Sequence, residues 1–139
     1  MTETYVTSVL AAASGGSKTG HSELGYGVDV WAEINWSVRN YGGLYYEYQM
    51  NASRHRWQKL GSGTVSSMMR ENFVISPGGI PTGRSGSTYS PSSGSWYTLT
   101  SADSSWYAYI SGGQLEYQGF TTVSYTGGTG SAMVTYRVS

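Results

Sequence analysis

The sequence predicts an all-β protein that folds as one antiparallel domain, with a sandwich or a barrel as the architecture. Three observations carry this prediction. Segments in which apolar and polar residues alternate recur along the chain, and turn signals separate them at intervals of about 8–12 residues. Aromatic residues with polar tips are abundant, with 13 Tyr and 5 Trp among 139 residues. A chain of this length is expected to form a single domain.

The first 27 residues are small, glycine-rich and weakly patterned. We expect residues 1–27 to form an N-terminal extension that packs on or flanks a sandwich domain of residues 28–139. Within it, residues 5–13 suit either a strand or a short helix, and residues 14–17 suit a loop. No Lys or Arg precedes Lys18, so the basic start of a conventional signal peptide is missing and we expect a chain that is not exported by the general route.

The clearest pattern is the alternation over residues 28–38, which predicts a half-buried strand. Trp36 lies on the apolar side of this strand and is expected in the core, whereas Trp31 lies on the opposite side. Residues 40–43 form a turn signal, and alternation resumes over residues 44–50. The two strands are expected to form a hairpin.

Weaker patterning follows. Residues 51–64 are polar and basic and are expected to be a loop, and residues 81–95, which are rich in Gly, Pro and Ser, are expected to be mostly loop. A short strand is expected over residues 72–75, followed by a turn over residues 76–79.

The last third of the chain again alternates and is expected to be strand. The predicted strands cover residues 96–100, 106–110, 115–125 (as one strand or two) and 132–138, with turns at 111–113 and 127–130. In the pairs Trp96-Tyr97 and Trp106-Tyr107 one ring must point inward and the other outward, because neighbours on a strand alternate.

Charge and cysteine content exclude several classes of function. The 8 basic and 8 acidic residues cancel, so the chain has no electrostatic basis for binding nucleic acid or a purely anionic lipid surface. The absence of Cys excludes disulfides and thiolate metal sites. No apolar run approaches the roughly 20 residues of a membrane span. We expect a monomer or a weak dimer.

Signs of catalysis are missing, and we expect neither an enzyme nor a bound cofactor. His21 and His55 lack the spacing of a zinc site, so no metal is expected. No nucleophile elbow is present, although a Ser-His-Asp triad assembled by the fold stays open. Glu33 and Glu47 could form a carboxylate pair, but two solvated strand residues explain them better.

The order of features from residue 31 onward resembles the aegerolysin family of small β-sandwich proteins. The matching segments are WAEINWSVRN (31–40), 44–50, RWQKL (56–60), VISP (74–77), GRS (83–85), GSWYTL (94–99) and 130–138. Gln58 stands where the family usually has Gly. The Trp-Asp-Cys-Pro-Trp segment of fungal members is missing, with Ser105-Trp106-Tyr107 near its place, and the acidic pI that is common in the family is also absent.

The resemblance implies a sandwich architecture and recognition of a membrane lipid, such as a sphingolipid with or without sterol. It further implies a larger perforin-like partner that makes the pore, as in bacterial two-component insecticidal toxins. Such a protein would be made in the bacterial cytoplasm and released to act at a target membrane. From the residues themselves, exposed Trp and Tyr suit the bilayer interface, and arginines suit a lipid phosphate.

Eight residues are candidates for this lipid site. They are Trp31, Arg54, Arg56, Trp57, Arg84, Trp96, Trp106 and Tyr107. Two other functions fit the same composition. A carbohydrate-binding lectin would also display Trp and Tyr, and a structural or phage surface module would use them for subunit contacts.

Overall fold

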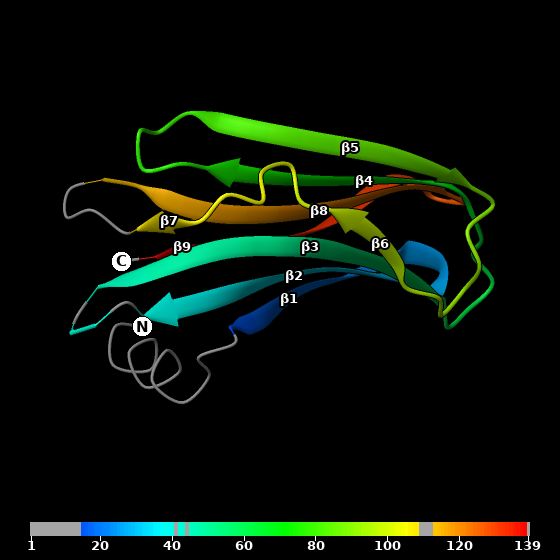
Figure 1. Ribbon diagram of the computed structural model, residues 1–139. Coiled ribbons are helices and arrows are strands. Elements are labelled where there is room, and N and C mark those ends of the chain that lie inside the picture. The colour runs from blue at the N-terminus through cyan, green and yellow to red at the C-terminus, as the bar shows by residue number, and fades with distance from the viewer. Residues whose placement is uncertain (1–14, 41, 44, 109–112, 139) are drawn as a thin grey trace.

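Two antiparallel sheets make up the computed structural model, which describes residues 15–40, 42–43, 45–108 and 113–138 (Figure 1). The strands are β1 (Gly16–Leu24), β2 (Val28–Asn40), β3 (Tyr46–Lys59), β4 (Val65–Ile75), β5 (Pro81–Tyr89), β6 (Tyr97–Thr100), β7 (Tyr107–Ala108), β8 (Leu115–Tyr125) and β9 (Gly128–Val138). A single 3₁₀ turn, η1 (Gly25–Gly27), joins β1 to β2. The prediction of an all-β antiparallel sandwich in one domain is confirmed.

The first sheet has the order β1-β2-β3-β6, with β7 also paired to β3, and the second has the order β5-β4-β8-β9. Every pairing between these named strands is antiparallel. Residues 16–24, which belong to the segment expected to be an extension, form β1 at one side of the first sheet. Residues 1–14, with the predicted strand or helix at 5–13, lie outside the described residues.

Two apolar clusters fill the space between the sheets. One contains Trp36, whose ring stacks on Tyr136 at a centroid distance of 3.9 Å, and the other contains Trp57 and Met68. The expected core position of Trp36 is therefore confirmed. Buried polar residues of β3, β4 and β8 lie between the two clusters. A hydrogen-bonded polar layer therefore separates the two apolar clusters.

This polar layer is a continuous chain of hydrogen bonds. Asn72 donates to Ser53, Ser53 bonds to Nε2 of His55 at 2.7 Å, and Nδ1 of His55 bonds to Thr121 at 2.7 Å. Thr121 in turn donates to the backbone carbonyl of Trp31 at 2.8 Å. The layer therefore ties β2 to β8, and all four side chains have 0% exposure.

Two predicted loops are in fact strands. Residues 51–59 continue β3. Their strand pattern was hidden because a β-bulge opposite Asn35 and Trp36 reverses the phase of the alternation. Before the bulge the even residue Met50 faces inward, and after it the odd residue His55 does so. Residues 81–89 form β5, an edge strand whose mostly exposed Gly, Ser and Thr residues hide the strand pattern.

The other predicted strands differ less from the observed ones. The strand expected at 72–75 is the end of β4, which begins at Val65. Of the segment expected at 106–110 only Tyr107 and Ala108 pair with β3, and residues 109–112, which include part of the predicted 111–113 turn, lie outside the described residues. The predicted β2–β3 hairpin is confirmed, and β8 and β9 also pair as a hairpin.

The side of the sandwich formed by β1 and β9 is closely packed. A Cβ atom on Gly20 would lie 1.9 Å from the carbonyl oxygen of Met133, so only glycine lets the two strands approach this closely. Lys18 adds a hydrogen bond from Nζ to the carbonyl oxygen of Thr135 at 2.7 Å. The edge strand β1 is thus held by contacts to both sheets.

Candidate functional site

A row of rings and guanidinium groups crosses the outer face of the first sheet. His21 of β1 lies opposite Trp31 of β2, and Trp31 lies opposite Arg56 of β3. The imidazole stacks on the indole at 4.5 Å, and the Arg56 guanidinium lies 4.3 Å from the centre of the Trp31 ring. Trp96, just before β6, continues the row at 5.5 Å from Arg56 and 4.5 Å from Arg54. We call His21, Trp31, Arg54, Arg56 and Trp96 the outer row.

The two arginines of the outer row differ in their partners. Arg54 donates two hydrogen bonds to the carboxylate of Glu33, at 2.8 and 3.1 Å, and this bonding raises the pKa of Arg54 above its ordinary value. Arg56 donates from Nη2 to the amide oxygen of Gln58 at 3.1 Å, while its buried Nε has no hydrogen-bond partner. Among the residues that the structure describes, Arg56 makes no ion pair. Its positive charge is therefore balanced only by ring faces and a neutral amide.

The structure brings four of the eight predicted site residues together in the outer row: Trp31, Arg54, Arg56 and Trp96. All four residues are half-buried. Arg84 does not join them, because it is exposed on β5 of the second sheet.

Trp57 was expected in a loop where it could bind lipid, and the structure corrects this. It is a core residue of β3 with 4% exposure, and its indole N–H donates to the carbonyl oxygen of Pro91 at 2.8 Å. The physical reason is strand alternation, because a strand that presents Arg56 outward must turn its neighbour inward.

Trp106 and Tyr107 lie at the other end of the first sheet. The Arg39 guanidinium lies 4.1 Å from the centre of the Trp106 ring, and Arg39 is eight positions beyond Trp31 on β2, or roughly 26 Å at strand spacing. Tyr107 packs against the core and donates its hydroxyl to Asp103. Burial alone would raise the pKa of Asp103, but hydrogen bonds from Ser105 and Tyr107 hold it below its usual value.

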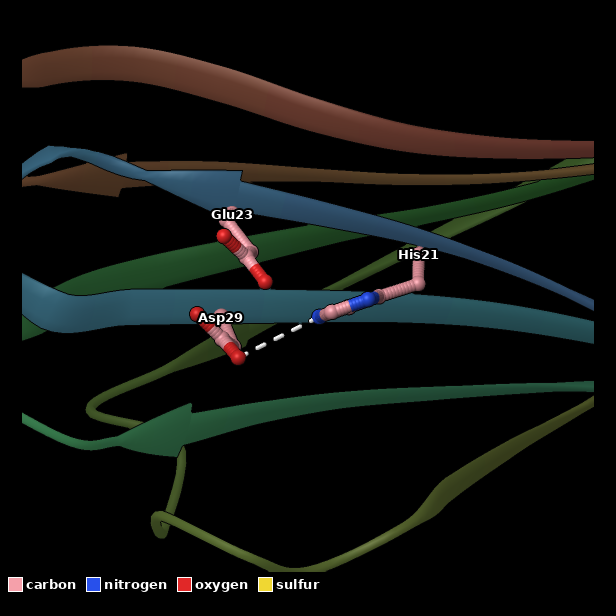
Figure 2. A group of neighbouring side chains, drawn as sticks. All are labelled: His21, Glu23 and Asp29. Carbon is pink, nitrogen blue, oxygen red and sulfur yellow. Dashed lines mark hydrogen bonds and ion pairs between the residues drawn. The ribbon is translucent and has the colours of Figure 1, made fainter.

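The register of the first hairpin also collects three potential metal ligands beside the outer row. His21 and Glu23 are two positions apart on β1 and share its outer face, and Asp29 of β2 lies directly opposite Glu23. Nε2 of His21 lies 3.2 Å from a carboxylate oxygen of Asp29 (Figure 2). One ligand atom from each of the three lies within 4.8 Å of the others. From the sequence no metal was expected, and these three residues were not recognised as a group.

This group was missed because residues 16–24 carried no strand pattern. The available signal was the short Gly-Tyr-Gly turn at residues 25–27, which sets the β1–β2 register. Once that register is known, His21 must face Trp31. Glu33 and Glu47, for which two solvated strand residues were the favoured interpretation, each pair with an arginine instead: Glu33 with Arg54 and Glu47 with Arg39.

A serine and a histidine do meet, but not where a substrate could reach them. Ser53 and His55 are hydrogen-bonded like a nucleophile and its base, and both are completely buried in the polar layer. Burial, together with the charge of Arg70, lowers the pKa of His55 to about 3, so the ring is neutral near pH 7. We therefore assign the Ser53–His55 pair to the structure of the core and not to catalysis.

Two further features complete the surface. At the turn end of the first sheet, Tyr26 and Leu60 are 57% and 66% exposed, and hydrogen bonds from Gly63 to Tyr26 and from Leu60 to Gly27 join the two turns. Tyr26 is held at a φ of 62°, a conformation that costs energy for any residue other than glycine. On the second sheet, a shallow groove is lined by residues that include Met69 and Tyr89.

No helix within the described ranges has the length and apolar character needed to cross a bilayer. Comparison of the chain with models of protein families, with curated proteins and with solved structures finds no match.

Proposed function

We propose that this protein is a non-catalytic binding module that attaches to membranes by recognising the zwitterionic headgroup of a lipid. One observation carries the proposal: Arg56 lies between two indole rings, with no carboxylate partner in the described part of the chain and with a buried Nε that bonds to nothing. A guanidinium group without a carboxylate partner is suited to bind a phosphate.

The surroundings of Arg56 match the other charge of such a headgroup. Asp29 and Glu33 flank Trp31 on the outer face of β2, one alternate position to either side. Their carboxylates would attract the ammonium or trimethylammonium group that accompanies the phosphate. Positive and negative groups therefore alternate across a small area, which suits a zwitterion better than a uniformly anionic surface.

The turn end of the sheet supplies the apolar contact. Trp31 is the fourth residue of β2, so the outer row lies roughly 10 Å from the turns that expose Tyr26 and Leu60. A tyrosine and a leucine at a tip suit shallow insertion into the bilayer, while tryptophans behind them suit the headgroup layer. The strained backbone of Tyr26 is consistent with a side chain that is displayed for binding.

The lectin alternative is weaker on the same geometry. Sugar binding by an indole needs a free ring face, and the two neighbouring strands place His21 and Arg56 against the two faces of Trp31. A role in subunit contacts finds no specific support in the outer row.

Recruitment of a larger perforin-like partner, as one half of a two-component pore-forming toxin, is the second part of the proposal. It rests on the resemblance to aegerolysins. It requires that the protein alone binds vesicles without opening them, so we expect no release of a trapped dye when the protein is added by itself.

Co-sedimentation with vesicles tests the first part. We expect binding to phosphatidylcholine or sphingomyelin vesicles, with or without cholesterol, that changes little with salt. An Arg56→Gln variant should bind about 10–100-fold more weakly, as expected for loss of a hydrogen bond between charged groups. Arg84→Gln is the matched control, because it removes the same charge from an exposed site on the other sheet.

Three outcomes would contradict the proposal. They are equal binding of Arg56→Gln and the unaltered protein, equal binding to every vesicle composition, and binding to glycans without binding to vesicles.

A further inference from the structure

We propose that His21, Glu23 and Asp29 form a binding site for a divalent transition-metal ion, with Zn²⁺ as the ion that fits best, on the outer face of the β1–β2 hairpin (Figure 2). This inference does not depend on lipid binding. It rests on the geometry of the three side chains, on the burial of Asp29 and on the fixed orientation of the imidazole.

The geometry already approaches that of a coordinated ion. Bonds of about 2.0–2.2 Å to a tetrahedral Zn²⁺ place neighbouring ligand atoms about 3.3 Å apart. Nε2 of His21 and the carboxylate oxygen of Asp29 are 3.2 Å apart, and the carboxylate of Glu23 points into the same space (Figure 2). Glu23 is exposed, so its side chain can rotate to close the remaining distance.

The burial of Asp29 is the independent reason to expect a cation here. Asp29 is 8% exposed, and a buried carboxylate needs a compensating charge. Three other carboxylates of the described chain, on Glu33, Glu47 and Glu116, each pair with an arginine. Within the described ranges, Asp29 pairs with an imidazole, that of His21, and with no arginine or lysine, and Glu23 makes no ion pair. A divalent cation would balance both carboxylates.

The imidazole is held in a single plane. Its ring stacks on Trp31 at 4.5 Å with an interplanar angle of 12°, and Nε2 faces Asp29. A fixed ring reduces the entropy that is lost when a ligand atom binds a metal, in the way that neighbouring groups orient histidines in other metal sites.

The donor set selects the class of metal. One nitrogen and carboxylate oxygens suit Zn²⁺ and related transition-metal ions, whereas Ca²⁺ needs six to eight oxygen ligands, more than these three side chains supply. Three protein ligands on an open sheet surface leave at least one coordination position for water or for an outside ligand. The bound ion would also link β1 to β2.

Titration calorimetry of the untagged full-length protein with ZnCl₂ tests the site. We expect saturable binding of a single ion per chain and a melting temperature that rises by roughly 5 °C when Zn²⁺ is in excess. Asp29→Asn should weaken binding at least about tenfold. Because Asp29 is buried and its loss could affect folding, Glu23→Gln and His21→Gln, at exposed positions, are tested beside it.

The control is Glu71→Gln, which removes a carboxylate from the second sheet and should leave Zn²⁺ affinity unchanged. Circular dichroism establishes that each variant is folded. Absence of saturable Zn²⁺ binding would overturn the proposal. So would an affinity that stays the same in both the His21→Gln and the Glu23→Gln variants.

Discussion

His55 is completely buried between the sheets, and we predict that it makes the fold sensitive to mild acid. Burial first, and then the charge of Arg70, lowers the pKa of His55 to about 3 in the folded chain. In the unfolded chain its pKa returns to about 6.5. The unfolded state therefore takes up a proton first as the pH falls. The contribution of His55 to stability is complete above about pH 6.5 and is lost progressively as the pH falls toward 3.

The two pKa values set the size of the effect. For one site, the free energy of unfolding falls by about 1.4 kcal/mol between about pH 8 and about pH 5.5. The complete difference between the two pKa values corresponds to an upper limit of about 5 kcal/mol, reached only in stronger acid. We choose the milder range because ordinary carboxyl groups, with pKa values near 4, stay ionised there.

Urea denaturation at the two pH values measures the change. Each experiment is done with and without the substitution His55→Gln, in a chelating buffer and in a His21→Gln background. His21 is the only other histidine of the chain, so this background leaves His55 as the one histidine that can contribute to the change. The substitution His55→Gln breaks part of the polar layer and lowers stability at both pH values, but the pH-dependent part should disappear.

Two results would refute this reasoning. One is an equal loss of stability between the two pH values with and without His55. The other is a nuclear magnetic resonance titration in which the ring of His55 in the folded protein gains a proton near pH 6.5.

Two further predictions concern packing. Gly20→Ala should lower the free energy of unfolding by about 1–3 kcal/mol, because the added Cβ meets the Met133 carbonyl. Gly78→Ala, where the nearest atom to an added Cβ is the Ser76 hydroxyl oxygen at 4.0 Å, should change it by less than about 0.5 kcal/mol. Equal effects of the two substitutions in thermal denaturation would contradict the close approach of β1 and β9. Trp57→Phe should lower the free energy of unfolding by about 1–3 kcal/mol, because it leaves the Pro91 carbonyl without its hydrogen-bond donor. The same substitution should leave vesicle binding unchanged. Weakened vesicle binding by the folded variant would place Trp57 on the binding surface.

Much of the fold could be predicted from periodicity. The β2–β3 hairpin follows from alternation on both sides of a glycine turn, and Trp36 and Trp31 lie on the two sides that the alternation assigns to them. The prediction was wrong where alternation is broken or absent. The bulge opposite Asn35 reverses the phase of β3, and the exposed edge strand β5 has no apolar side to reveal it.

The candidate site was predicted in part. Trp31 and the arginines of β3 could be selected from their residue types, but the residues that contact them could not. The proposed metal ligands His21 and Asp29 come from two strands, and only the register set by the η1 turn places them together. Trp57 was selected for its residue type, whereas strand alternation beyond the bulge turns it into the core.

The sequence by itself determined the class of the fold, because alternation and turn chemistry act over a few neighbouring residues and can be read locally. It also determined which residue types were available for binding. The tertiary structure alone decided which of them meet. Cross-strand register sets those contacts, and a single bulge or turn moves every later side chain to the other face of its strand.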